Sequence, residues 1–70
     1  MTPLVLRIRE LRSARGWSQR ELSRLAKVRQ ATVSHLESGN VKTVDLAILE
    51  RLAKALDVDA GYLIVNKGRR

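Results

Sequence analysis

Five small or uncharged polar side chains share one face of the helix expected after Arg29. At helical spacing they fall together, on the side opposite the apolar positions: Gln30, Ala31, Ser34, His35 and Ser38. A surface helix without a ligand usually carries Lys and Glu at four-residue spacing instead. Amide, hydroxyl and imidazole groups both donate and accept hydrogen bonds. This face can therefore bond to the edges of nucleic-acid bases.

Positive charge surrounds that face and extends over the chain. Arg29 stands where a Ser, Thr, Asn or Asp cap is usual, although a cation is unfavourable at the positive end of a helix dipole. The 70 residues carry a net charge of +7, which favours a nucleic acid over the alternative, an acidic membrane surface. The chain has one Trp, one Tyr and no Phe. Binders of single strands need several stacking aromatics, so duplex DNA is the expected partner.

Two short helices and a tight turn must position these side chains. Ser18 and Glu21 have the spacing of a capping box, which predicts the start of the first of the two helices. Its apolar face is expected to be Leu22, Leu25 and Ala26, and residues 27–29 form the turn. The second helix buries two apolar side chains three positions apart: Val33 and Leu36.

A helix is expected before this pair, near the N-terminus. Thr2 is its predicted cap and Pro3 its first residue, and Gly16 ends it as a left-handed terminator. Its apolar stripe lies at helical spacing: Leu4, Ile8 and Leu11. Trp17 comes next and is expected to pack on Leu22, which is a structural role rather than a ligand-binding one.

Two more helices are expected after a short extended connection at residues 41–44. Asp45 is the predicted cap of the fourth helix, with Thr43 as the alternative, and Glu50 and Lys54 are predicted to pair on its wet side. Its apolar stripe is regular: Leu46, Leu49, Leu52, Ala53 and Leu56. Asp59 is the predicted cap of a last short helix that runs through Ile64. The prediction is one all-α domain over residues 1–65 with a basic tail at 66–70.

Other classes of function find little support in the sequence. There is no cysteine and a single histidine, His35, so neither a disulfide framework nor a metal site is expected. No phosphate-binding or nucleophile motif is present, so we expect no enzyme activity and no cofactor. No signal peptide or membrane span is expected, and a cytoplasmic protein associated with the nucleoid fits these features.

Three segments resemble the Cro and phage-repressor type of helix-turn-helix domain, the XRE family: L-R-S-A-R-G-W-S-Q-R-E-L-S-R-L-A, Q-A-T-V-S-H-L-E-S-G and L-E-R-L-A-K-A-L-D-V-D-A-G-Y-L. The connection V-K-T-V-D-L is similar to a short, single-domain branch of that family. The resemblance implies a five-helix, lambda-repressor-like fold. It also implies a structural ion pair between Arg12 and Glu37. Lys27 stands where the family usually has Gly, and a left-handed backbone would cost Lys about 1 kcal/mol.

The expected function is a transcriptional regulator, most simply a repressor, whose third helix reads the major groove of duplex DNA. Gln30 can bond adenine, Arg29 guanine or a phosphate, and Ala31 a thymine methyl group. Ser34 and His35, one turn further on, can reach a base or the backbone, and His35 could instead be a solvated ring. Phosphate contacts are expected from residues on both sides of that helix: Gln19, Lys27, Asn40, Lys42 and Thr43. Lys27 could equally be a solvated surface residue.

The expected working unit is a homodimer on a palindromic operator, because one such domain contacts few base pairs. Apolar residues of the fourth and fifth helices are the candidate dimer surface, unless they only complete the core: Ile48, Tyr62, Ile64 and Val65. The alternative function is an antitoxin or another interaction module of the same fold that sequesters a protein such as a toxin. A phage, restriction-modification or housekeeping role stays open at this point.

Overall fold

The computed structural model describes residues 5–65 and is mostly helical. The elements follow in the order β1 (Val5–Leu6), α1 (Ile8–Ala14), α2 (Gln19–Ala26), α3 (Gln30–Glu37), α4 (Leu46–Leu56), α5 (Ala60–Leu63) and β2 (Ile64–Val65). Five helices were expected, and five are present over the described residues. The predicted residues 1–4 of the first helix and the tail at 66–70 lie outside them.

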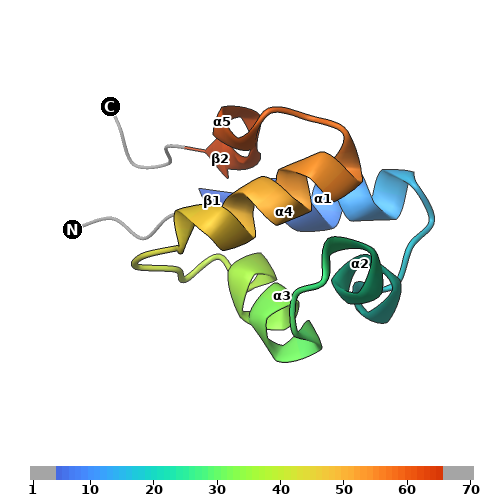
Figure 1. Ribbon diagram of the computed structural model, residues 1–70. Coiled ribbons are helices and arrows are strands. Elements are labelled where there is room, and N and C mark those ends of the chain that lie inside the picture. The colour runs from blue at the N-terminus through green and yellow to red at the C-terminus, as the bar shows by residue number, and fades with distance from the viewer. Residues whose placement is uncertain (1–4, 66–70) are drawn as a thin grey trace.

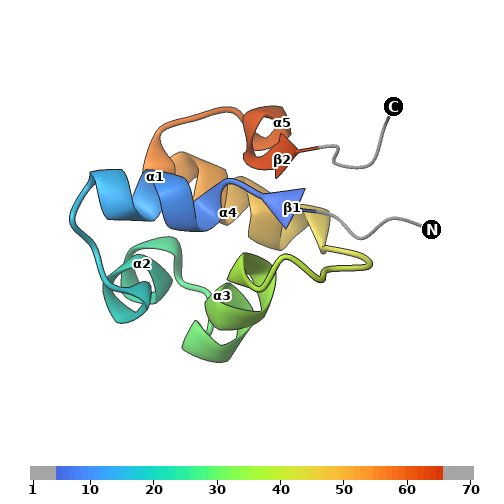
Figure 2. The ribbon, with the colours of Figure 1, turned by 180° about the vertical axis from the view of Figure 1, so that it is seen from behind.

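The long helix α4 lies at the centre of the molecule (Figure 1). The pair α2 and α3 covers one side of it, and α5 with β2 covers the other. From behind, α1 and β1 are seen to close the remaining side (Figure 2). Eight side chains with less than 2% exposure form the centre of the core: Ile8, Leu22, Val33, Val41, Leu49, Leu52, Leu56 and Leu63. The α2–α3 pair is thus held on a scaffold made by α1 and α4.

The start of the first helix was predicted wrongly. Val5 and Leu6 form a strand instead, paired antiparallel with β2 in the register Val5 to Val65 and Leu6 to Ile64. The backbone N–H of Arg7 extends this link by donating to the carbonyl of Leu63 at 2.8 Å. A pairing between the two ends of the domain leaves no periodic pattern within either segment, so local spacing cannot reveal it. Ile64 therefore belongs to a strand and not to α5.

Four smaller expectations were also wrong. Leu25 is 54% exposed and Leu46 is 62% exposed, although both were placed in apolar stripes. The Asp59 side chain makes no cap hydrogen bond to α5. Within residues 5–65 every ion pair involves Glu37, so Glu50 and Lys54 do not form the predicted pair. The two leucines were placed by spacing alone, whereas neighbouring elements decide which positions are covered.

The predicted ends of the central helices are confirmed. Ser18 Oγ accepts the N–H of Glu21 at 3.0 Å, and a Glu21 carboxylate oxygen accepts the N–H of Ser18 at 2.7 Å. Asp45 accepts the N–H of Ala47 at 2.8 Å and so caps α4. Gly16 has a φ of +71°, which suits a glycine after α1. These local interactions fix where α2 and α4 begin.

Candidate nucleic-acid interface

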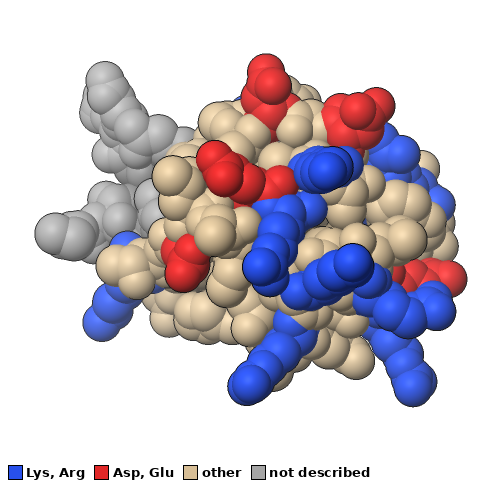
Figure 3. All heavy atoms as spheres, in the orientation of Figure 1, with Lys and Arg blue, Asp and Glu red and all other residues tan. Residues whose placement is uncertain are grey.

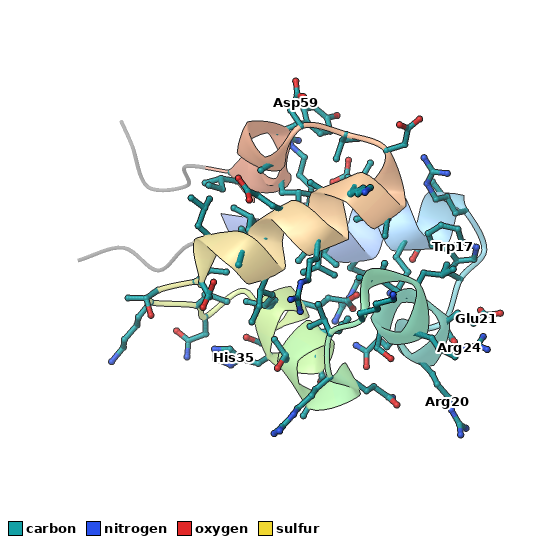
Figure 4. The ribbon with its side chains drawn as sticks, in the orientation of Figure 1. Trp17, Arg20, Glu21, Arg24, His35 and Asp59 are labelled. Atoms are coloured by element: carbon teal, nitrogen blue, oxygen red, sulfur yellow. The ribbon has the colours of Figure 1, made fainter. Side chains whose placement is uncertain are left out.

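The outer face of α3 is exposed and polar. Val33, Leu36 and Glu37 point inward and are buried, while four residues on the opposite side are exposed: Gln30, Ala31, Ser34 and His35. None of the polar side chains among these four makes a hydrogen bond within the described part of the chain. His35 projects from α3 into solvent (Figure 4). The structure thus brings four of the five expected base-reading residues together, and three of them have free hydrogen-bonding side chains.

Arg29, the fifth expected base-reading residue, lies at the N-cap of α3. Its backbone is extended, with φ −60° and ψ 143°, and its side chain caps nothing. The guanidinium is exposed at the end of α3 that carries Gln30. The first N–H groups of the helix add positive potential at the same place. This end of α3 therefore suits a negatively charged or strongly accepting partner.

The inner face of α3 is fixed by a buried ion pair. Arg12 Nε and Nη2 donate to the two Glu37 carboxylate oxygens at 2.7 and 2.9 Å, in a bidentate arrangement. Arg12 Nη1 also donates to the carbonyl of Trp17 at 2.7 Å. The Glu37 side chain has no exposed surface and that of Arg12 keeps 15%. This contact joins α1, the α1–α2 connection and the end of α3, as the family resemblance implied.

The ion pair shifts the pKa values of both groups. Burial opposes ionisation of Glu37, but hydrogen bonds from Arg12 and Gln19 and the charges of Arg12 and Arg9 outweigh it, so the Glu37 pKa is lowered. The hydrogen bond to Glu37 raises the pKa of Arg12 despite its partial burial. Both groups are therefore charged at neutral pH.

Gln19, an expected phosphate ligand, has a structural contact. Its side-chain Nε2 donates to Glu37 Oε1 at 3.0 Å, at the start of α2. Sequence reasoning did not find this bond, because the two residues are 18 positions apart in the chain. The amide keeps a second N–H group that the structure leaves without a partner in the described residues. Gln19 thus connects the ion pair beneath α3 to the N-terminal end of α2.

Lys27, another expected phosphate ligand, ends α2 in the left-handed conformation. Its φ is 58° and its ψ is 46°, as expected if it replaces a family glycine. Its carbonyl accepts a hydrogen bond from Arg51 Nη1 of α4 at 3.3 Å. This contact of Arg51 was not predicted and gave no signal in the sequence. The structure leaves the Lys27 ammonium exposed at the α2–α3 turn.

The remaining expected phosphate ligands lie in the loop after α3, at the end of the helix opposite Arg29. Asn40, Lys42 and Thr43 are all exposed. The Asn40 N–H donates to Ser38 Oγ at 3.2 Å, and Ser38 Oγ in turn donates to the carbonyl of His35 at 2.6 Å. The Ser38 hydroxyl therefore closes the end of α3. The expected anchors thus stand at the two ends of α3, with the free polar face between them.

Charge is divided between the two sides of the molecule. Basic side chains gather over the lower half in Figure 3, where α2 and α3 lie, and most acidic ones lie over the upper half. Arg20 and Arg24 project from α2 into solvent beside Glu21 (Figure 4). In α4, α5 and their connections the carboxylates predominate: Asp45, Glu50, Asp57 and Asp59. The basic half is the half that carries the polar face of α3.

Two kinds of feature, a metal-binding cluster and a membrane-spanning helix, are absent from the described residues. Across residues 5–65, no group of three or more His, Cys, Asp or Glu side chains could hold a metal ion. No helix in the same range has the length and apolar character needed to cross a membrane.

Comparison with known proteins agrees with this geometry. The model of the helix-turn-helix family matches residues 8–63. The chain belongs to this XRE-type helix-turn-helix family. The residues that carried the resemblance lie on α1 to α5 and on the loops between them. The two helices joined by a tight turn, expected from the sequence, are α2 and α3.

The chain is similar to several known regulators. The restriction-modification controller protein C.AhdI from Aeromonas hydrophila is 38% identical, with a TM-score of 0.72 over 80% of this chain and 83% of that one. SinR, a master regulator for biofilm formation solved in complex with DNA, is 29% identical, with a TM-score of 0.73 over 79% and 87%. A competence pilus inhibition repressor from Acinetobacter baylyi is 34% identical over 83% of this chain. The chain spans about half the length of this last relative, 52%.

Proposed function

We propose that this protein binds double-stranded DNA at specific sequences and represses transcription there. The observation that carries the proposal is the outer face of α3, where exposed Gln30, Ser34 and His35 have unused hydrogen-bonding groups in a basic surrounding. Such groups can form hydrogen bonds with a partner that presents its own donors and acceptors, as base edges do in the major groove. The regulators named above, one of them solved with DNA, support the same function.

In this proposal α3 lies in the major groove and its exposed side chains read bases. Gln30, near the N-terminal end, bonds adenine through both amide groups, and Ala31 contacts a thymine methyl group. Arg29 bonds guanine or the nearest phosphate. Ser34 and His35 reach bases or the backbone one turn later. The spread of these residues over two turns supports a site of only a few base pairs for each copy of the chain.

Phosphate contacts in this proposal fix the position of α3 along the groove. Lys42, Asn40 and Thr43 bind one strand from the loop after α3, where they are exposed. Gln19, through its second amide N–H, and the free N–H groups at the start of α2 bind the other strand. Lys27 contributes a positive charge from the α2–α3 turn. Removing any one of these groups weakens binding to all sequences alike.

A homodimer on a palindromic operator is the proposed working unit. Tyr62 is 50% exposed and Ile64 is 37% exposed, and Ile48 and Val65 are half-buried beside the core. Ile48 lines a hollow with Lys27 and Thr32, on the side of α4 that faces the α2–α3 turn. Pairing of two copies through Tyr62, Ile64 and Val65 of α5 and β2 would bury the apolar surface on the other side. Two α3 helices about 34 Å apart would then enter successive turns of the groove. Sedimentation with and without operator DNA tests this, and a monomer in both cases would contradict it.

The same proposal places the protein in the cytoplasm, on the nucleoid, where such an operator lies. An antitoxin or another protein-binding module is the alternative function. A recognition surface for protein at α3 would be rich in leucine, whereas the exposed residues there are polar or small, which favours DNA.

Selection of binding sites from random duplexes, followed by titration of labelled DNA, tests the function. We expect an enriched sequence that the protein binds at least about a thousand times more tightly than a scrambled duplex at the same salt concentration. Gln30→Ala should reduce this preference at one position. Equal affinity for enriched and scrambled duplexes at moderate ionic strength would refute specific recognition.

A further inference from the structure

A basic groove lies where the α2–α3 turn meets α4. It consists of two hollows of about 390 Å³ each. The first is lined by Leu25, Ala26, Lys27, Arg51, Lys54 and Ala55. The second is lined by Lys27, Val28, Arg29, Thr32, Ile48 and Arg51. Both hollows include Lys27 and Arg51, so they adjoin where Arg51 Nη1 donates to the Lys27 carbonyl. We call the two adjoining hollows together the turn groove.

The turn groove combines apolar and positively charged groups. Leu25 is 54% exposed at one end of it, and Ile48, half-buried, lies at the other. Lys27, Arg29, Arg51 and Lys54 stand around these side chains, and no Asp or Glu is among the lining residues that the structure describes. Basic side chains fill this part of the surface in the front view of Figure 3. A matching ligand is therefore apolar and acidic at once.

Helix-end electrostatics account for only part of this arrangement. Lys54 lies in the last turn of α4 and Lys27 ends α2, so both favourably oppose the negative ends of helix dipoles. That stabilisation needs no exposed leucine beside the cations. Leu25 lies on a helix whose other apolar residues, Leu22 and Ala26, are buried. The stability of the fold does not explain why Leu25 is exposed in a hollow that it shares with Lys27, Arg51 and Lys54.

The groove is separate from the surface proposed to read DNA. Thr32 lines the groove, and Gln30 lies two positions away on α3, which places the two side chains on opposite flanks of the helix. Ser34 and His35 also lie outside the groove lining. Only Lys27 and Arg29 take part in both surfaces. A bound duplex would thus leave Leu25, Ala55 and Lys54 free for another partner.

The length of the groove indicates what fits it. Ile48, Arg51 and Ala55 lie on one face of α4, and the seven residue steps from Ile48 to Ala55 correspond to about 10 Å of helix. That distance matches two turns of a second helix laid along α4. We propose that the turn groove docks an acidic amphipathic helix of a partner protein. Its apolar residues contact Leu25 and Ile48, and its carboxylates bond the surrounding cations.

A synthetic peptide serves as the probe in the test. It is an amphipathic helix with Leu on one face and Glu on both flanking positions, labelled with a fluorophore and titrated with the full chain. A second peptide carries Gln in place of each Glu, and a third carries Ala in place of each Leu. We expect saturable binding of the first peptide and at least about tenfold weaker binding of each of the others.

Matched variants of the protein locate the binding site. Leu25→Gln and Lys54→Gln should each weaken the peptide about tenfold, the order expected when one leucine contact or one desolvated charge pair is lost. Leu46→Gln and Arg20→Gln are the controls, because Leu46 is 62% exposed but lies outside the groove and Arg20 is a basic residue elsewhere on the surface. Both controls should bind the peptide like the parent chain. Unfolding midpoints of all four variants verify that they are folded.

Several results would overturn the proposal. One is failure of the acidic peptide to bind, or equal binding to the groove and control variants. Another is equal binding of the Gln peptide, which would exclude an acidic partner. Complete displacement of the peptide by millimolar inorganic phosphate, with no effect of its leucines, would indicate a small-anion site instead. Loss of DNA affinity in both Leu25→Gln and Lys54→Gln would indicate a DNA contact. A negative peptide result leaves the proposed DNA binding untouched.

Discussion

The two faces of α3 carry polar side chains under opposite conditions. On the inner face, the Glu37 carboxylate is fully buried and accepts three hydrogen bonds, two from Arg12 and one from Gln19. On the outer face, Gln30, Ser34 and His35 are exposed, and their side chains bond to nothing in the described chain. The polar side chains on one face of α3 thus have their hydrogen-bond partners within the protein, and those on the other face do not.

This difference separates residues that build the fold from residues available to a ligand. A buried carboxylate must be paired and hydrogen-bonded, because an uncompensated buried charge costs on the order of several kcal/mol. Exposed polar groups bond to water and contribute little to stability. The inner face therefore determines where α3 sits, and the outer face can change its chemistry without disturbing that position. The predictions below test this separation, beginning with the largest effect.

Glu37→Ala should cause the largest loss. Arg12 would keep its partly buried charge without an anion beside it, and we expect the free energy of unfolding to fall by about 3–5 kcal/mol. Urea denaturation measures this directly. Glu10→Ala is the control, because Glu10 is exposed on α1 and takes part in no ion pair of the described chain, so its effect should stay within about 0.5 kcal/mol. Similar losses in both variants would end the claim that the inner face fixes α3.

Acid should reproduce this loss in the unmodified chain. Because the Glu37 pKa is lowered in the folded state, its contribution to stability is fully present above the unfolded pKa of about 4.3. The contribution is lost as the pH falls below that value and through the lower folded pKa. Urea denaturation between pH 7 and pH 3 should show this fall, and Glu37→Gln should flatten it. An unchanged pH profile in Glu37→Gln would assign the acid sensitivity to other carboxylates.

The apolar residues of the inner face were predictable from the sequence, but the polar contacts of Glu37 on that face were not. Apolar spacing identified Val33 and Leu36 as buried, since a surface helix shows its core side as a stripe. The Arg12–Glu37 pair came only from family resemblance, because nothing in the spacing of two residues 25 positions apart indicates contact. The Gln19 bond escaped prediction for the same reason. Long-range polar contacts depend on the assembled scaffold and not on any local pattern.

The two glutamines test the separation with one residue type. Gln30→Ala should leave stability unchanged and cost about 1–3 kcal/mol of binding to the selected duplex, at one base position. Gln19→Ala should instead lower the free energy of unfolding by about 1.5–3 kcal/mol, because its amide bonds a buried carboxylate. Its loss of DNA affinity should be equal for matched and scrambled duplexes, because its proposed DNA contact is to a phosphate. Parallel denaturation and DNA titration of both variants provide the measurement. A stability loss in Gln30→Ala with no change in DNA binding would reverse the assignment of the two faces.

Lys42→Ala should have a smaller and less selective effect. Lys42 is exposed in the loop after α3, and the proposal gives it a phosphate contact. Affinity should fall equally for matched and scrambled duplexes, and the slope of log affinity against log salt should decrease by about 1. Lys54→Ala removes an equal charge from α4, outside the proposed DNA surface, and serves as the control. A change confined to the matched duplex would make Lys42 a base reader.

The outer parts of the molecule were harder to predict than its centre. Leu25 and Leu46 fit apolar stripes by spacing, yet no other element covers them. The strand pairing of Val5 with Val65 joins the two ends of the domain, and the prediction of a longer α1 missed it. In contrast, the Ser18 and Asp45 caps were predicted correctly because a cap depends on residues within one turn. Sequence patterns thus located these two caps, although the same reasoning failed for Asp59. Exposure depends on what packs against a helix, which no local pattern contains.

Lys27→Gly should produce the smallest effect. Lys27 has both a structural role at the α2–α3 turn and a proposed phosphate contact. Lys27 has a φ of 58°, which glycine adopts without strain, so the substitution should raise the free energy of unfolding by up to about 1 kcal/mol. It also removes a charge from the α2–α3 turn, so DNA affinity should fall slightly although the fold becomes more stable. Lys27→Asn, which tolerates the same backbone, removes the charge with less backbone relief. If affinity rose together with stability in both variants, Lys27 would act only on the fold, and the proposed phosphate contact at this turn would be wrong.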